Sequence, residues 1–138
     1  MNEKYGNFPA YAQSKVANIL FSRVLAGILK GSGVTTYSLH PGTIMTEIGK
    51  DIPYLNNPIF ATTTYPLWWF FLKTLEGGAQ TTICCAVDEA LKGESGLYYS
   101  DCEAMTEGLP PATQNDEDAK KLWELSLKLT GLDREIKT

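Results

Sequence analysis

Residues 10–42 read AYAQSKVANILFSRVLAGILKGSGVTTYSLHPG, and this stretch predicts the class of fold. In its first part apolar side chains recur every four residues, which predicts an amphipathic helix over residues 10–30. Gly31 and Gly33 follow it, where glycine commonly ends a helix in the left-handed conformation. The β-branched and aromatic residues at 34–39 then predict a short strand. A helix, a tight glycine turn and a strand form half of a βαβ unit, so we expect an α/β fold.

Tyr11 and Lys15 lie four residues apart in the predicted helix, so their side chains share one face. An ammonium about 4 Å from a phenolate stabilises it by about 4 kcal/mol at an effective dielectric near 20. Such a pair can act as a general acid and base at neutral pH on an oxygen bound to carbon. The same spacing also arises by chance in a chain with seven tyrosines. The alternative interpretation is therefore a surface helix with an ordinary lysine.

The sequence His40-Pro41-Gly42 interrupts the predicted strand at its carboxyl end. Open α/β sheets bind their ligands at this end of their strands. Thr43 and Thr46 add two hydroxyl groups to the loop that follows, over residues 43–48. We interpret His40 as a strand-end residue whose ring is hydrogen-bonded, with a proton relay as the alternative.

Residues 50–74 have no regular period, contain three prolines and are rich in tyrosine, tryptophan and phenylalanine. A connection of this length without clear secondary structure is often a lid or a binding loop. Two alternatives remain open: burial of the aromatic side chains against the domain, and shallow contact with a membrane surface.

The second half of the chain predicts two more helices and one more strand. Thr74 is expected to cap a helix that Gly93 closes, and residues 96–100 are expected to form a strand. A last helix is expected to begin at the acidic cluster 116–118 and to end at Gly131.

Composition excludes several classes of function. The 138 residues carry a net charge of −4, which argues against binding to nucleic acid. The three cysteines form no C-x-x-C pair and there is one histidine, so no metal site is expected. Reduced, packed thiols favour a cytosolic environment. The polar start of the chain is unlike a signal peptide, and the apolar run at 66–72 is too short to span a bilayer, which needs about 20 residues.

Three segments together carry a family resemblance. They are residues 10–21, residues 33–35, and the run SLHPG at 38–42 with Thr46-Glu47 behind it. In this order and at these spacings they resemble the carboxyl-terminal half of a short-chain dehydrogenase/reductase, and they are most similar to the retinol dehydrogenase group. The resemblance covers nearly the whole chain.

The resemblance implies a fold and a division of the chain. The 138 residues would form a single partial domain, the carboxyl-terminal part of a doubly wound Rossmann-type fold that lacks the amino-terminal dinucleotide-binding βαβ units. Residues 10–30 would be the catalytic helix, and residues 34–48 the strand and the cofactor loop. Residues 50–74 would be the substrate lid, and residues 75–138 the carboxyl-terminal helices and the last strand.

The resemblance also implies a reaction and its residues. Tyr11 would be the catalytic proton donor and acceptor, and Lys15 would support it and contact the nicotinamide ribose. Hydride would pass between NADP(H), with NAD as the alternative, and a lipophilic alcohol or aldehyde such as a retinoid. The residues implied to bind the cofactor are Tyr11, Lys15, Pro41, Gly42, Ile44 and Thr46.

The sequence departs from the family pattern in one respect. It contains no glycine-rich turn of the Thr-Gly-x-x-x-Gly-x-Gly kind, which would bind the cofactor pyrophosphate. We therefore expect the chain to be part of a longer protein and inactive alone. The alternative is a non-catalytic fragment or isoform that acts as an interaction module, either as a homodimer or paired with a full-length subunit. The family further implies the cytoplasm or the cytosolic face of the endoplasmic reticulum, with peripheral membrane contact.

Overall fold

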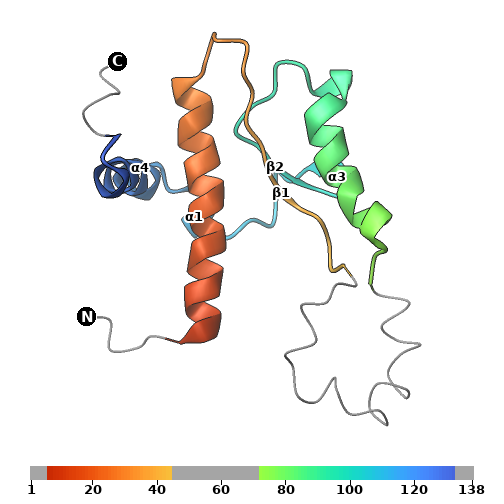
Figure 1. Cartoon of the computed structure of the whole chain (residues 1–138), viewed down its shortest axis with the longest axis horizontal. Helices are drawn as coiled ribbons and strands as arrows, with labels where there is room; N and C mark the ends of the chain where they lie inside the picture. Colours follow the sequence, from red (N-terminus) through yellow and green to blue (C-terminus); the bar gives the residue numbers. More distant parts are fainter. Residues whose placement is uncertain (1–5, 45–71, 133–138) are drawn as a thin grey trace. The chain divides into compact units, whose positions relative to one another are not determined.

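The computed structural model describes residues 6–44 and 72–132 (Figure 1). These residues form an α/β structure, as predicted. The lid predicted at 50–74, except for its last three residues, and Thr46 lie outside the described residues. The elements, in chain order, are α1 (Asn7–Ile28), β1 (Ser38–His40), α3 (Leu75–Val87), the 3₁₀ helix η2 (Glu89–Leu91), β2 (Tyr98–Ser100), β3 (Glu103–Ala104), the 3₁₀ helix η3 (Pro111–Gln114) and α4 (Asp116–Thr130).

The chain divides into two compact units. The first unit comprises Met1–Ser38, Leu91–Tyr98 and Ala104–Thr138, and the second unit comprises Leu39–Ala90 and Tyr99–Glu103. The chain therefore passes between the units within β1, η2, β2 and β3. That all 138 residues belong to one partial domain stays a prediction.

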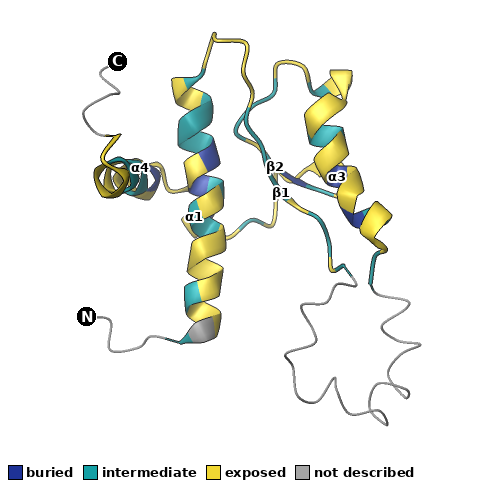
Figure 2. Ribbon diagram, viewed as in Figure 1, coloured by how far each residue is buried: buried dark blue, intermediate teal, exposed yellow. Residues whose placement is uncertain are grey.

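The first unit is built on the packing of α1 against α4. Leu20 of α1 and Ala119 of α4 are buried, and the rings of Phe21 and Trp123 lie 5.0 Å apart between their centres. Figure 2 marks the few buried positions on both helices. Arg23 of α1 donates hydrogen bonds to the carbonyl oxygen of Thr113 at 2.7 Å and to the Asp116 carboxylate at 2.6 Å. The amphipathic pattern of residues 10–30 thus marks a helix that begins earlier, at Asn7, and ends earlier, at Ile28, and its apolar stripe contributes to the contact with α4.

The ends of the helices follow local rules. After α1, Gly31 and Gly33 adopt φ values of +85° and +81°, as the predicted glycine turn requires. Gly131 ends α4 with a φ of +74°, also as predicted. The Asn115 side chain caps α4 by accepting hydrogen bonds from the N–H groups of Glu117 and Asp118.

The helix α3 begins as predicted and ends earlier than predicted. The Thr74 hydroxyl oxygen accepts a hydrogen bond from the Gly77 N–H at 3.0 Å, which confirms Thr74 as the cap. The α-helix stops at Val87, and the predicted continuation toward Gly93 is the 3₁₀ helix η2. The reason is Asp88, whose side chain accepts a hydrogen bond from the Ala90 N–H at 2.9 Å and so competes with helical bonding of the backbone.

The three strands form one sheet in the order β1-β2-β3. Both predicted strands are present but start later: β1 begins at Ser38 rather than at residue 34 and includes His40, and β2 begins at Tyr98 rather than at residue 96. Single hydrogen bonds extend the contact backwards, from the Gly96 N–H to Thr36 and from the Ser38 N–H to Leu97. The strand β3 was not predicted, since a Glu-Ala pair carries no β-strand pattern; it pairs with β2 through a two-residue turn.

Candidate active site

Tyr11 and Lys15 come together on the exposed side of α1. Lys15 Nζ lies 5.1 Å from the centre of the Tyr11 ring, as the spacing of four residues on a helix predicts. The Tyr11 side chain is 62% exposed, so its phenol is open to a bound molecule. Lys15 forms no ion pair with another described residue. An ammonium and a solvent-accessible phenol thus lie next to each other, as acid/base chemistry on a bound oxygen requires.

Ser14 has a local role. Its hydroxyl donates a hydrogen bond to the carbonyl oxygen of Tyr11 at 2.7 Å, within one turn of the helix. This contact occupies the serine with the backbone of α1. It agrees with a structural role for Ser14.

The segment 40–44 follows β1 and holds three of the predicted cofactor residues, Pro41, Gly42 and Ile44. Gly42 has a φ of +83°, and its N–H donates a hydrogen bond to His40 Nδ1 at 2.9 Å. The His40 ring is therefore hydrogen-bonded at the strand end, as predicted. Its Nδ1 lone pair is used to hold the turn, so it is not available for a proton relay.

Lys73 secures this segment from one side. Its N–H donates to the carbonyl oxygen of Thr43 at 2.8 Å, and it forms a parallel bridge with Ile44. Its aliphatic chain covers Gly42 so closely that a Cβ on Gly42 would lie 2.8 Å from Lys73 Cδ. Its ammonium forms an ion pair with Asp101, in the turn between β2 and β3.

The helix α3 secures the same segment through Gly78. This glycine is buried, and the Ile44 side chain fills the space where a Cβ of Gly78 would lie. Sequence reasoning missed Lys73, Asp101 and Gly78 as residues that shape the loop. Gly78 did carry a signal, since a glycine inside a helical pattern often marks close packing.

The predicted site residues are distributed over both units. Tyr11 and Lys15 belong to the first unit, whereas Pro41, Gly42 and Ile44 belong to the second. Thr46 lies outside the described residues. Within each unit the predicted neighbours are adjacent: the phenol beside the ammonium, and the Pro-Gly turn beside Ile44.

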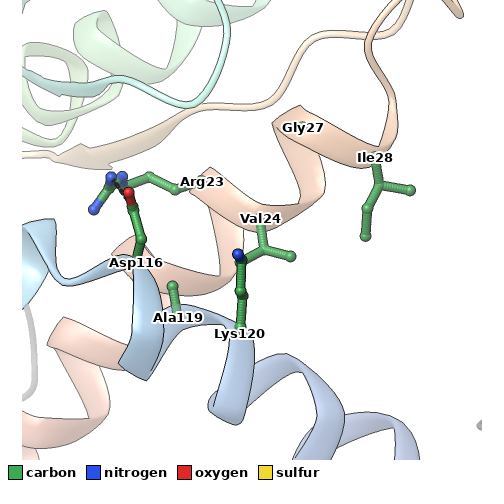
Figure 3. Close-up of a pocket in the computed structure, with 7 residues that line it drawn as sticks. All are labelled: Arg23, Val24, Gly27, Ile28, Asp116, Ala119 and Lys120. Carbon is green, nitrogen blue, oxygen red and sulfur yellow. Dashed lines mark hydrogen bonds and ion pairs between the residues drawn. The ribbon is translucent and has the colours of Figure 1, made fainter.

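A groove lies between α1 and α4 (Figure 3), and neither Tyr11 nor Lys15 is among its lining residues. Its volume is about 380 Å³, and the ion pair of Arg23 with Asp116 closes one end of it. Its lining residues are Arg23, Val24, Gly27, Ile28, Asp116, Ala119 and Lys120. Because Arg23 is already bonded twice, we assign the groove to the packing of the two helices.

The cysteines of the second unit form a cluster of free thiols. Burial raises the pKa of Cys84 to about 11, and a side-chain hydrogen bond with Cys102 and repulsion from nearby charges add to this. Burial, followed by repulsion from Cys102, also raises the pKa of Cys85. Among the described residues no group of histidine, cysteine and acidic side chains has the arrangement of a metal site. None of the described helices could cross a membrane.

Along the chain, an exposed Tyr-x-x-x-Lys pair on a helix is followed by a strand and a Pro-Gly turn, in the order that the resemblance to short-chain dehydrogenases/reductases predicted. Over most of its length the chain is similar to members of the short-chain dehydrogenase/reductase family, as the resemblance predicted. It is 44% identical over 124 residues to dehydrogenase/reductase SDR family member 13 of Bos taurus, an alignment that covers 89% of this chain and 31% of that protein.

Two other relatives are named as retinol dehydrogenases. Identity to retinol dehydrogenase 11 of Homo sapiens is 42% over 126 residues, which covers 89% of this chain and 36% of that protein. Identity to retinol dehydrogenase 12 of Bos taurus is 40% over 131 residues, which covers 94% of this chain and 39% of that protein. The chain thus spans between 31% and 39% of the length of these relatives. No family model matches the sequence.

Proposed function

We propose that this chain supplies the acid/base part of a nicotinamide-dependent oxidoreductase of the retinol dehydrogenase type. The observation that carries the proposal is the pair on α1, with Lys15 Nζ 5.1 Å from the centre of the exposed Tyr11 ring. Similarity to two proteins named as retinol dehydrogenases supports a lipophilic alcohol or aldehyde as the substrate.

Tyr11 is the proposed proton donor and acceptor. During reduction of an aldehyde, its hydroxyl donates a proton to the substrate oxygen; during oxidation of an alcohol, the phenolate accepts that proton. Lys15 stabilises the phenolate by charge. The ammonium lies over the ring, with Nζ 5.1 Å from the ring centre. The phenol is exposed in the described structure, so a substrate that excludes water from it would strengthen the effect.

The donor groups of the chain suit a nicotinamide nucleotide. When bound, NADP(H) or NAD(H) donates or accepts the hydride. The Lys15 ammonium has no ion-pair partner among the described residues and can donate to ribose hydroxyls. Pro41, Gly42 and Ile44 are proposed to lie against the nicotinamide, on a turn that His40 and Lys73 hold in shape. Thr46 is proposed to contribute a hydroxyl to the same cofactor.

A chimeric enzyme tests the proposal. The chain replaces the aligned segment of human retinol dehydrogenase 11, to which it is 42% identical, and oxidation of NADPH or NADH by all-trans-retinal is followed at 340 nm. We expect activity in the chimera, and a loss of about 10²- to 10⁴-fold in kcat in its Tyr11→Phe variant with cofactor affinity retained. A folded chimera that binds cofactor and keeps most of its rate after Tyr11→Phe refutes the assignment.

A non-catalytic interaction module is the second candidate. It is favoured by three large apolar side chains of α1 that are exposed in the described structure, Phe8, Phe21 and Ile28. Two measurements on the chain alone, each with and without NADPH, separate the candidates: analytical ultracentrifugation gives its size, and thermal denaturation gives its melting temperature. A stable dimer that NADPH neither stabilises against heat nor changes in size supports the module. A rise in melting temperature with NADPH supports cofactor binding by the chain itself.

A further inference from the structure

The turn between β2 and β3 has an unusual residue at its tip. Asp101 and Cys102 both have left-handed backbone angles, with φ values of +54° and +65°. A two-residue hairpin turn with positive φ at both positions normally uses asparagine or aspartate followed by glycine. Here a cysteine stands where glycine is preferred. An outlier of this kind points to a role for the side chain.

Cys102 lies next to a second cysteine, Cys84 of α3. Cys84 Sγ of α3 donates a hydrogen bond to the carbonyl oxygen of Cys102 at 3.9 Å, and the proximity of Cys102 adds to the rise in the pKa of Cys84. Cys102 is exposed, whereas Cys84 is partly buried. The turn therefore presents one thiol to solvent and holds it against another that is shielded.

We propose that Cys102 and Cys84 are an oxidisable thiol pair that a peroxide converts to an intramolecular disulfide. The exposed Cys102 thiolate attacks one peroxide oxygen, the O–O bond breaks, and Cys102 becomes a sulfenic acid while hydroxide leaves and takes up a proton as water. Cys84 sulfur then displaces the sulfenic hydroxyl group; the thiol proton of Cys84 leaves with it as a second water. In total, two thiols and one hydrogen peroxide give one disulfide and two waters.

The order of the two steps follows from exposure and charge. Peroxide reaches Cys102 from solvent, and the thiolate is the reactive form of a cysteine. Cys84 stays protonated at neutral pH and its Sγ lies 3.8 Å from the Asp88 carboxylate, which repels a thiolate. Cys84 is therefore the less reactive thiol toward peroxide and enters in the second step, in which it loses its proton as its sulfur attacks the Cys102 sulfenic sulfur.

Mass spectrometry of the full chain tests the proposal. The chain is treated with one equivalent of hydrogen peroxide, blocked with iodoacetamide and digested with trypsin without reduction. Cleavage after Lys73, Lys92 and Lys120 separates a peptide with Cys84 and Cys85 from a peptide with Cys102. We expect these two peptides joined, with the loss of two hydrogens, and separated again by dithiothreitol.

Two serine variants identify the partner. The cross-link should persist in Cys85→Ser and disappear in Cys84→Ser. Cys102→Gly is a second test variant, since glycine suits the left-handed φ and preserves the turn; it should also lose the cross-link. The proposal is overturned by a link that survives Cys84→Ser, by a Cys84-Cys85 bond, by disulfides formed only between chains, or by oxidation that stops at sulfinic acid.

Discussion

Replacing Gly78 by alanine should reveal how tightly α3 holds the candidate cofactor loop. Gly78 is buried, and a Cβ at this position would overlap Ile44 Cδ1 and lie 2.6 Å from Ile44 Cγ1. Alanine gains up to about 1 kcal/mol of helix propensity over glycine. Overpacking in a filled site costs about 1–3 kcal/mol. The Gly78→Ala variant should therefore be less stable than the original chain by about 0–2 kcal/mol.

Gly77→Ala is the matched control in the same helix. An added Cβ there meets Thr74 Oγ1 at 3.3 Å and no atom of Ile44. Both variants gain the same propensity, so the difference between their free energies of unfolding isolates the contact with Ile44. We expect a difference of about 1–3 kcal/mol, measured by urea denaturation monitored by circular dichroism.

A double-mutant cycle completes the test. In an Ile44→Ala background the three atoms that obstruct the new Cβ are gone. Gly78→Ala should then become stabilising, because it keeps the propensity gain and fills part of the new cavity. If Gly78→Ala has the same effect in both backgrounds, the contact between Gly78 and Ile44 does not determine the packing, and the account of the loop is refuted.

Three other perturbations have expected outcomes. Arg23→Met should destabilise the chain by about 1.5–3 kcal/mol, because the carbonyl of buried Thr113 loses a charged donor. Asp116→Asn should cost less than about 1 kcal/mol, because the Asp116 side chain is 78% exposed. Equal losses in urea denaturation would contradict this ranking. In the chimeric enzyme Lys15→Met should raise the Kd for NADPH and lower kcat, while the free energy of unfolding changes by less than about 0.5 kcal/mol. The Lys15→Arg variant should bind NADPH more tightly than Lys15→Met, and an unchanged Kd in Lys15→Met would exclude the ribose contact. Since the pKa of Cys84 is about 11, its alkylation by iodoacetamide should rise about tenfold per pH unit from pH 8 to pH 10, and a plateau below pH 10 would disprove the shift.

The helices were predictable because their signals are local. The stripe at every fourth residue gave α1, and the glycines at 31, 33 and 131 gave its end and that of α4. The pair of Tyr11 and Lys15 belongs to the same category, since a helix alone brings residues four apart together. No knowledge of the rest of the fold was needed for these features.

The strands were harder to delimit because a ladder depends on its partner. Residues 34–37 have the composition of a strand, yet β1 begins at Ser38. The strand β3 has no strand composition at all and exists because the turn at 101–102 returns the chain to β2. Pairing across the sheet, which no local pattern encodes, sets these limits.

The supports of the candidate cofactor loop were missed for the same reason. Lys73 and Asp101 are 28 residues apart, so their ion pair is a product of the tertiary structure. It follows that Gly42 is required by more than its positive φ, because the chain of Lys73 occupies the space beside it. The short turn of Asp101 and Cys102 then has two separate tasks in the second unit. Its aspartate anchors the lysine that covers the loop, and its cysteine meets Cys84. A change at Asp101 should therefore affect the loop through Lys73, although Asp101 lies 28 residues from that lysine in sequence.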